Sequence, residues 1–282
     1  EIQQALPTVE QTLLIDHISK ETADLKNTVL WSQALRDTDD SVLTFAQLPF
    51  DHPLWVVYSS GTTGLPKPIV HGHGGVILEH YKAVVFHNDI KPDDRFYWYS
   101  STGWMMWNYL IGALFAKATL VIYNGSPAYP NANAQFELAE KAGVTYFGTS
   151  AAFISACLNA GIHPSQDYDL SAIRAVGSTG SPLSTDGFRW IYENINKDLA
   201  LESLSGGTDL CTAFVGGART FPIYMGEIQG ASLGANVQAF DEEGKPIRNK
   251  VGELVITEPM PSMPLSFWND EGMALYRESY FS

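Results

Sequence analysis

The sequence predicts an α/β protein whose mostly parallel sheet is covered on both faces, followed by a β-rich region. From residue 54 to residue 204, short apolar runs typical of strands alternate with longer runs typical of helices. After Thr208 the helix-like runs give way to frequent glycines and strand–turn–strand patterns. With 282 residues, of which 45% are hydrophobic and 17% charged, the chain can bury a sizeable core.

The first part of the chain supplies the elements of the parallel sheet. The predicted strands are residues 54–58, 95–99, 119–123, 144–147, 174–177 and 200–204. The predicted helices are residues 76–86, 106–116, 136–142, 151–158 and 187–195. Strands that alternate with helices in this way form β–α–β units, in which the helices cover the faces of a parallel sheet.

The second part of the chain predicts antiparallel strands. Residues 237–240 and 253–257 read as strands, and the turn Asp241-Glu242-Glu243-Gly244 follows the first of them. We therefore divide the chain into an N-terminal segment of the large domain (1–50), an α/β subdomain (51–214) and a β-rich, incomplete subdomain (215–282).

Composition excludes some classes of protein. The 31 acidic and 17 basic residues give a net charge of −14, which repels phosphodiester backbones and argues against general nucleic-acid binding. Residues 104–123 are long and apolar, but Lys117 would be costly inside a bilayer, so we expect no membrane span. The two cysteines, Cys157 and Cys211, have no metal or redox spacing and favour a reducing, cytoplasmic location.

The stretch Tyr58-Ser59-Ser60-Gly61-Thr62-Thr63-Gly64-Leu65-Pro66-Lys67 has the composition of a phosphate-binding loop. Its two glycines let backbone amides approach an anion, and four hydroxyls and one lysine supply further donors. The spacing Gly-x-x-Gly-x-x-Lys differs from the P-loop of nucleotide triphosphatases. The alternative is a flexible surface turn that binds nothing.

Two further segments turn polar or glycine-rich where a predicted strand ends. They are residues 177–182 and 203–209. Ligands of doubly wound sheets bind beyond the carboxyl ends of the strands, so the three segments together predict one binding site.

In this order the three segments resemble the phosphate loop, the adenine segment and the aromatic-Gly-x-Thr-Glu-type segment of the acyl-adenylate-forming enzymes. That superfamily includes acyl-CoA synthetases, adenylation domains of peptide synthetases and luciferases. Gly252-Glu253-Leu254 matches a further structural motif, so the resemblance covers about residues 45–282. The resemblance to the acetoacetyl-CoA synthetases is the strongest, and it is carried by residues 50–75, 101–108 and 205–209.

The resemblance implies a layered α/β N-terminal domain and an ATP-dependent, AMP-forming ligation. A carboxylic acid reacts with Mg·ATP to give an acyl-adenylate, and coenzyme A then displaces AMP. The implied ligands of the β- and γ-phosphates are Ser60, Gly61, Thr62, Thr63, Gly64 and Lys67. The implied adenine-binding residues are Gly180, Ser181, Pro182, Ser203 and Ser205.

Two residues of the third segment carry implied catalytic and metal-binding roles. Thr208 would bind the α-phosphate and act in catalysis together with Lys67, and Asp209 would bind Mg²⁺. Most relatives have glutamate at the position of Asp209, and acetyl-CoA synthetases have glutamate at that of Ser181. These are departures from the pattern.

The resemblance also implies where the acid binds. The expected acyl pocket consists of Trp104, Met105, Met106, Thr179 and Gly206. Acetyl-CoA synthetases narrow this pocket with a tryptophan at the position of Gly206, so its absence favours the longer acid acetoacetate. The segment 100–108 has no aspartate, which disfavours an α-amino acid because a buried ammonium would lack a partner.

Structural interpretations of the same residues stay open. Trp104, Met105 and Trp107 are equally suited to a core, and Thr208-Asp209 to a helix N-cap. His71-Gly72-His73 invites a metal interpretation, but it lacks a third ligand nearby. We expect the pair Asp93-Asp94 to lie in a solvated turn.

Two other functions stay open. One is adenylation of another short or medium acid, with transfer to coenzyme A or a carrier protein. The other is a non-catalytic nucleotide-binding relative. The chain runs from Glu1 to Ser282, short of the family's ribose-binding aspartate, hinge and C-terminal lid domain. We expect that missing domain to be its partner and the fragment alone to be inactive.

Overall fold

The chain folds into two compact units, Glu1–Leu48 and Pro49–Ser282. A computed structural model describes residues 2–15, 25–36, 42–59 and 66–281. The predicted division of residues 51–282 into two subdomains stays a prediction.

The first unit has little internal packing. Its strands β1 (Thr12–Leu14) and β2 (Thr28–Leu30) pair in parallel, and its helices α1 (Ile2–Ala5) and α2 (Trp31–Ala34) are single turns. No residue described in this unit is buried. The described part of the unit therefore has no hydrophobic core of its own.

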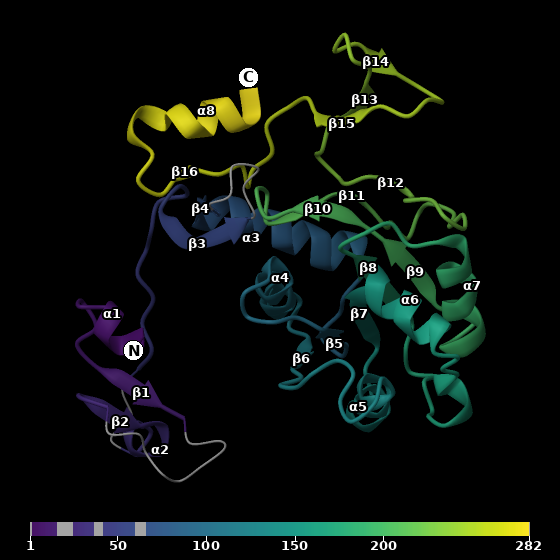
Figure 1. Cartoon of the computed structure of the whole chain (residues 1–282), viewed down its shortest axis with the longest axis horizontal. Coiled ribbons are helices and arrows are strands. Elements are labelled where there is room, and N and C mark those ends of the chain that lie inside the picture. Colours follow the sequence, from purple (N-terminus) through teal and green to yellow (C-terminus); the bar gives the residue numbers. More distant parts are fainter. Residues whose placement is uncertain (1, 16–24, 37–41, 60–65, 282) are drawn as a thin grey trace. The chain divides into compact units, whose positions relative to one another are not determined.

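A five-stranded parallel sheet organises the second unit (Figure 1). Its order is β6-β5-β7-β8-β9, and all neighbouring strands run parallel. The strands are β5 (Arg95–Trp98), β6 (Thr119–Val121), β7 (Tyr146–Ser150), β8 (Ala175–Thr179) and β9 (Ala200–Ser203). They overlap the five strands predicted between residues 95 and 204, which confirms the parallel sheet.

Helices cover both faces of this sheet, as predicted. They are α4 (Met105–Gly112), η2 (Ala113–Ala116), α5 (Ala134–Ala142), α6 (Ala151–Asn159), η3 (Pro164–Gln166) and α7 (Thr185–Asn194). Among the described residues no helix has the length and apolar character needed to cross a bilayer.

The alternation of side chains along β5 divides the core into two clusters. Phe96 and Trp98 belong to a cluster with residues of α4 and η2, whereas Tyr97 belongs to one with residues of α5, α6 and α7. Successive side chains of a strand point to opposite faces, so the continuous apolar run of β5 is explained by burial on both sides.

One expected strand lies outside the parallel sheet. β3 (Pro53–Ser59) forms where predicted, but it pairs antiparallel with β4 (Lys67–Gly72), and β16 (Ser266–Phe267) pairs antiparallel with β4. The expectation that the β–α alternation begins at residue 54 was therefore wrong. A short connection joins β3 to β4, and parallel neighbours need a longer crossover.

The helix predicted at residues 76–86 forms in two parts. α3 (His73–Tyr81) begins directly after β4 and continues as a π-helix, η1 (Lys82–His87). The next described strand after it is β5.

The remaining elements are mainly antiparallel. β10 (Ser205–Gly207), β11 (Thr212–Gly216) and β12 (Gly230–Ala231) form one sheet, and β13 (Val237–Phe240), β14 (Pro246–Ile247) and β15 (Glu253–Ile256) form another. The strands predicted at residues 237–240 and 253–257 are confirmed. After β16 the chain ends in η4 (Glu271–Met273) and α8 (Ala274–Phe281), a helix that the sequence pattern did not predict.

Candidate functional site

A cavity of about 450 Å³ lies where β8 and β9 end. Its walls come from the N-terminal end of α4, the segments that follow β8 and β9, and the β10–β11 hairpin. Residues predicted to bind the adenine, the acyl group and the α-phosphate all line it. They are Trp104, Met105, Met106, Thr179, Gly180, Ser181, Pro182, Ser203, Ser205, Gly206 and Thr208.

The predicted adenine segment turns sharply after β8. Gly180 has φ +90°, a conformation that favours glycine, and carries the chain out of the strand. The Thr179 hydroxyl donates to the Leu204 carbonyl at 3.0 Å and thereby ties the end of β8 to the residue after β9. Ser181 and Pro182 follow on the cavity wall. The role of this segment toward adenine stays a prediction.

The predicted acyl wall stands at the start of α4. Met106 is buried in the core as well as lining the cavity, whereas Trp104 and Met105 are half-buried. Trp107, the residue offered as core, packs against the same cluster and is not part of the cavity wall. Met106 is therefore both a core residue and part of the cavity wall, and its role toward the acid stays a prediction.

The backbone of β11 approaches Gly206 so closely that a side chain would not fit there, which the sequence did not reveal. A Cβ at this position would lie 2.3 Å from the Thr212 carbonyl oxygen and 2.8 Å from the Ala213 Cα. The β10–β11 pairing has a register shift between Ser205 and Gly206, which brings the two backbones together there. The absence of a side chain at Gly206 thus serves the packing of the hairpin, whatever it does for the width of the acyl pocket.

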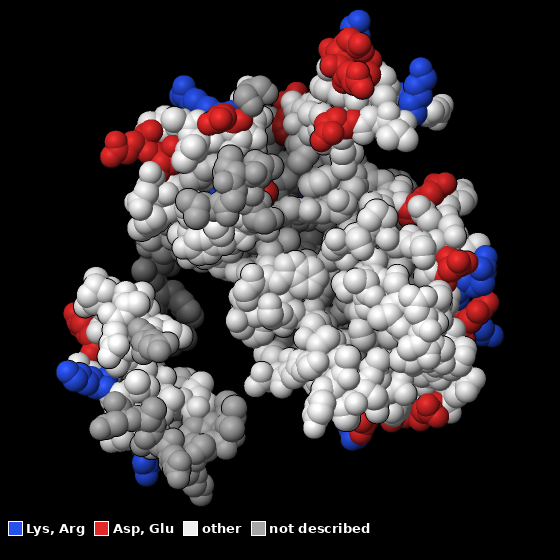
Figure 2. Space-filling view, in the orientation of Figure 1, with Lys and Arg blue, Asp and Glu red and all other residues white. Residues whose placement is uncertain are grey.

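The described cavity wall carries no charged side chain. On the face shown in Figure 2, charged residues gather over α7, α8 and β13–β15, while the surface over α4 and β6 is almost uncharged. An ammonium group in this cavity would find no carboxylate among the described lining residues, in line with the expectation that an amino acid is not the substrate.

Charged groups lie beside the first cavity. Asp209 lines a neighbouring cavity that shares Gly207 and Leu254 with the first. Lys67 Nζ is 3.6 Å from Asp209 Oδ1, and the Tyr280 hydroxyl of α8 donates to the same oxygen. Lys67 also lies over the rings of Tyr280 and Phe267, with 5.3 Å and 5.7 Å to the ring centroids. The structure thus brings the predicted phosphate-binding lysine to the predicted metal ligand.

Most of the predicted phosphate loop lies outside the described residues, namely Ser60, Gly61, Thr62, Thr63 and Gly64. Ser59 and Lys67, which flank the loop, pair with each other at the ends of β3 and β4.

Asp209 suits a magnesium ion that arrives with a nucleotide. Mg²⁺ in such sites commonly binds one or two carboxylates, substrate phosphates and water. The Asp209 side chain is 32% exposed, so its carboxylate can reach an ion. No group of three or more His, Cys, Asp or Glu side chains among the described residues could hold a metal by itself.

The pair His71 and His73 does not form a joint site. His71 is fully buried, and its ring nitrogens face the carbonyl oxygens of Thr208 and Ser262 at 2.9 Å and 3.2 Å. His73 packs edge-on against His52, with 5.6 Å between ring centroids. His71 therefore contacts the backbone of a predicted catalytic residue, a link that spacing along the chain could not show.

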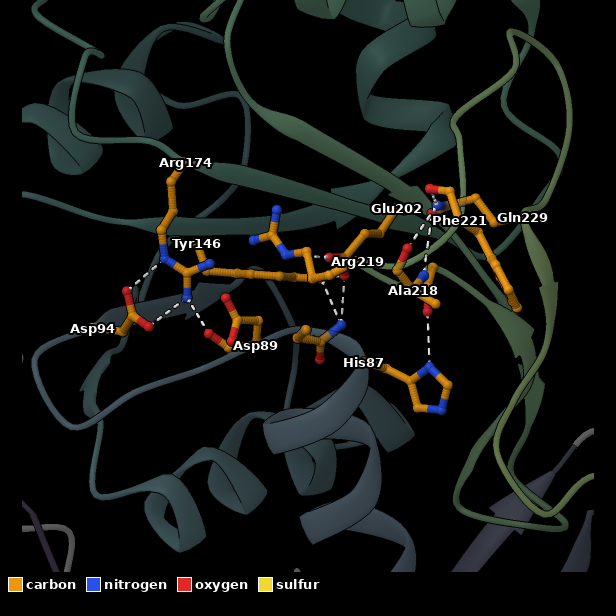
Figure 3. A network of polar contacts seen from close by, with 12 residues as sticks. His87, Asp89, Asp94, Tyr146, Arg174, Glu202, Ala218, Arg219, Phe221 and Gln229 are labelled. Atoms are coloured by element: carbon orange, nitrogen blue, oxygen red, sulfur yellow. Dashed lines mark hydrogen bonds and ion pairs between the residues drawn. The ribbon is translucent and has the colours of Figure 1, made fainter.

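A buried polar network behind the cavity was also missed from the sequence. Glu202, 1% exposed, accepts hydrogen bonds from Asn88 Nδ2 at 2.6 Å and from the Tyr146 hydroxyl at 2.8 Å. Arg219 Nε lies 3.9 Å from its other oxygen, as Figure 3 shows. Tyr109, which lines the cavity, donates to Asn88 Oδ1. The network thus connects the floor of the cavity to β9.

The expectation that Asp93 and Asp94 lie in a solvated turn was wrong for Asp94. Asp94 is 6% exposed and pairs with Arg174, whose Nε is 2.9 Å from Oδ1 (Figure 3). Burial alone would raise the pKa of Asp94, but hydrogen bonds from Arg174, Thr145 and the Lys91 amide outweigh it and lower that pKa. The partner lies 80 residues away in the sequence, so the adjacent aspartates gave no sign of it.

Comparison with known proteins identifies the family of this chain. Residues 1–264 match the family described as AMP-binding enzyme. The chain belongs to this family. The layered α/β fold predicted from the sequence is confirmed by a solved member, acetoacetyl-CoA synthetase from Streptomyces lividans. That structure superposes with a TM-score of 0.92 at 48% identity and covers 100% of this chain.

Curated members of the family show similar identity. The acetoacetyl-coenzyme A synthetase of Rhizobium meliloti (strain 1021) is 48% identical over 239 residues, which is 85% of this chain. The acetoacetyl-CoA synthetase of Gallus gallus is 39% identical over 288 residues, which is 100% of this chain. The chain spans 37% and 43% of these two proteins, less than half of their length.

Proposed function

We propose that this chain is the nucleotide- and acid-binding part of an ATP-dependent, AMP-forming ligase that joins acetoacetate to coenzyme A. The observation that carries the proposal is that residues of the adenine segment, the acyl wall and Thr208 line one cavity. The names of the relatives, all acetoacetyl-CoA synthetases, support the choice of acid and thiol.

The proposed reaction has two steps. In the first, a carboxylate oxygen of the acid attacks the α-phosphorus of ATP, and the bond to the departing pyrophosphate breaks. In the second, the thiol sulfur of coenzyme A loses its proton and attacks the acyl carbon, and AMP leaves. Both steps develop negative charge on phosphate oxygens, so fixed donors and cations lower the barrier.

The residues around the cavity suit these steps. The hydroxyl of Thr208 would donate to the α-phosphate, while Lys67 and the loop residues Ser60–Gly64 would hold the β- and γ-phosphates. Asp209 would hold Mg²⁺, which neutralises phosphate charge when it is bound. The distance of 3.6 Å between Lys67 Nζ and Asp209 Oδ1 supports a shared role of the two residues, because Asp209 directly follows Thr208 in the chain.

The cavity suits a short keto acid. Its acyl end would be formed by five residues that all line the cavity, Trp104, Met105, Met106, Thr179 and Gly206. Such a wall can bury a four-carbon chain while a few polar groups fix its orientation. An uncharged wall also gives no advantage to an amino acid over a simple acid.

The proposal extends to cofactors and location. The whole protein would use ATP, Mg²⁺ and coenzyme A, would bind no nucleic acid, would have no membrane span, and would complete its site with a C-terminal domain. A cytoplasmic location is supported by Cys157 and Cys211, which are both buried and free.

Pyrophosphate exchange into ATP tests the first step. The natural gene product that contains this sequence should catalyse exchange with acetoacetate faster than with acetate, propionate or butyrate. Replacing Thr208 by valine should lower kcat roughly 100-fold, because one donor to the charged transition state is lost. Thr119→Val is the control, since Thr119 is exposed on the edge strand β6 and lines neither cavity.

Three outcomes would contradict the proposal. Exchange with no acid would leave a nucleotide-binding protein without the reaction. Preference for acetate or a fatty acid would retain the chemistry and exclude acetoacetate as the substrate. An equal effect of Thr208→Val and Thr119→Val would remove Thr208 from the reaction.

A further inference from the structure

Thr208, a predicted catalytic residue, and Asp209, the predicted metal ligand, form part of a four-residue hairpin loop. Residues 208–211 connect β10 to β11, and the amides of Leu210 and Cys211 donate to the Gly207 carbonyl at 3.1 Å and 2.9 Å. Cys211 has φ +53°, an uncommon conformation for a residue with a side chain. A loop of this kind needs contacts from outside to hold one conformation.

Three buried side chains provide such contacts. His71 Nε2 lies 2.9 Å from the Thr208 carbonyl, the Ser262 hydroxyl donates to the Leu210 carbonyl at 2.5 Å, and His80 Nε2 donates to the Cys211 carbonyl at 2.8 Å. The exposed fractions of the three residues are 0%, 2% and 1%. Three carbonyls of a four-residue loop are thus bound by side chains that water does not reach.

The three donors come from separate parts of the chain. His71 lies on β4, His80 on α3, and Ser262 in the segment between β15 and β16. Figure 1 shows the β10–β11 hairpin beside β4 and α3. A Cβ on Gly75 of α3 would lie 2.1 Å from the Pro261 carbonyl oxygen, so a glycine lets the Ser262 segment approach the helix.

The protonation of the two histidines is consistent with this role. Burial lowers the pKa of His80 to about 4, against the effect of its bond to Cys211, so the ring is neutral at pH 7 and its proton lies on Nε2. Burial also lowers the pKa of His71, against the two carbonyls and the charge of Asp209. A neutral His71 donates to only one of its two carbonyls, and the shorter contact assigns the proton to Nε2, facing Thr208.

We infer that His71, His80 and Ser262 are positioning residues that fix the Thr208–Cys211 loop in its reactive geometry. They bind its carbonyl groups, while Thr208 lines the first cavity and Asp209 the second. The inference rests on the proposed function for its effect on rate, but its structural part concerns the loop alone. Small errors in the position of a reacting group can cost about 100-fold in rate.

Two variants of His71 separate the effect of its hydrogen-bond donor from that of its bulk. His71→Gln keeps a nitrogen donor close to the position of Nε2, whereas His71→Leu keeps the bulk and removes the donor. We expect His71→Leu to lower kcat of pyrophosphate exchange by about 10- to 100-fold with KM for the acid unchanged. His71→Gln should recover most of that loss.

Hydrogen exchange measures the loop directly. The amides of Leu210 and Cys211 should exchange faster in His71→Leu than in the wild type, and close to the wild-type rate in His71→Gln. His163→Leu is the matched control, because His163 also makes a side-chain hydrogen bond, to Asn194 Oδ1 at 2.5 Å, but away from the hairpin. It should leave both kcat and the exchange of the loop amides unchanged.

Several results would overturn the inference. Unchanged kcat or unchanged loop exchange in a folded His71→Leu variant would do so, as would equal effects of His163→Leu. If His71→Leu does not fold, Ser262→Ala removes a single donor with little loss of volume, and unchanged kcat and loop exchange in it would be equally decisive. A wild-type protein without pyrophosphate exchange refutes the proposed function instead, and the exchange of the loop amides still decides whether these side chains hold the loop.

Discussion

Burial of single polar residues gives this fold a specific response to pH. His80 is neutral in the folded protein because burial lowers its pKa from 6.5 to about 4, and the titratable side chains near it are His71 and Tyr109. The unfolded chain binds a proton at higher pH than the folded one. The stability due to neutral His80 is therefore present above pH 6.5 and is lost as the pH falls from 6.5 through about 4.

The variant His80→Gln should remove this loss. Glutamine keeps a donor for the Cys211 carbonyl but does not titrate. The free energy of unfolding of the wild type should fall relative to that of His80→Gln by up to ~3 kcal/mol between neutral and acid pH. Urea unfolding of both proteins across this range measures the difference. A constant difference would show that His80 does not titrate as described.

Glu202 should give the opposite pH response. Burial raises its pKa above 4.5, although hydrogen bonds from Tyr146 and Asn88 and the charge of Arg219 act against that shift. The folded state therefore holds the proton more tightly than the unfolded chain. The stability that this adds is fully present below pH 4.5 and is lost as the pH rises through the folded pKa.

The variant Glu202→Gln should therefore become more stable relative to the wild type as the pH rises. The isosteric amide carries no charge to desolvate. Denaturant titrations from pH 4.5 upward measure the two free energies of unfolding. Parallel curves for the two proteins would contradict the account of Glu202.

Among the elements, the β10–β11 hairpin leaves no room for a side chain at Gly206. The predicted clash of a Cβ at Gly206 is with the backbone of β11, which cannot rotate away as a side chain can. Gly206→Ala should therefore destabilise the fold by about 1–3 kcal/mol. Gly103→Ala is the control, because the nearest atom to its Cβ would be 4.0 Å away.

Urea unfolding of the two alanine variants compares the positions. Equal stability would show that the hairpin can open to accept a side chain. This geometry also bears on the pocket. A tryptophan introduced at Gly206 would first disturb the hairpin, so the width of the acyl pocket is better measured with a series of acids than with that variant.

Local patterns identified most elements but not every pairing. β5 and the helices around it could be predicted because buried strands appear as short apolar runs, and helices as longer segments whose apolar residues recur every three to four positions. The pairing of β3 was not, since a strand pattern does not reveal its neighbour, and here a short connection made it antiparallel. α8 has no such pattern, because only Tyr276 among its residues is buried.

The site was predictable where the chemistry is local. The polar segments at the ends of β8 and β9 were recognised in the sequence, and they line the first cavity. The phosphate loop was inferred from the glycine, hydroxyl and lysine residues of one segment and stays a prediction. The contacts of His71, His80 and Ser262 with the loop were not predictable, because their sequence separations of 137, 131 and 52 residues are set by tertiary folding. Asp94 and Arg174 were missed for the same reason.

In the molecule as a whole, charged side chains are kept apart from the cavity proposed to bind the acyl group. The described wall of the first cavity is uncharged, whereas Asp209 lines the neighbouring cavity and Lys67 Nζ lies 3.6 Å from its carboxylate. This arrangement suits a reaction in which an apolar acyl group is buried while charge changes on phosphates beside it. We expect the chain by itself to form little thioester, and detectable acetoacetyl-CoA formation by the purified chain would contradict that expectation.

Transfer of oxygen-18 from the carboxylate of the acid to AMP is a direct test of the proposed acyl-adenylate route. The natural gene product that contains this sequence is incubated with acetoacetate labelled in its carboxylate, ATP, Mg²⁺ and coenzyme A, and the products are analysed by mass spectrometry. If a carboxylate oxygen attacks the α-phosphorus, AMP must carry one labelled oxygen. Label in inorganic phosphate, or product formed with unlabelled AMP, would contradict the acyl-adenylate route.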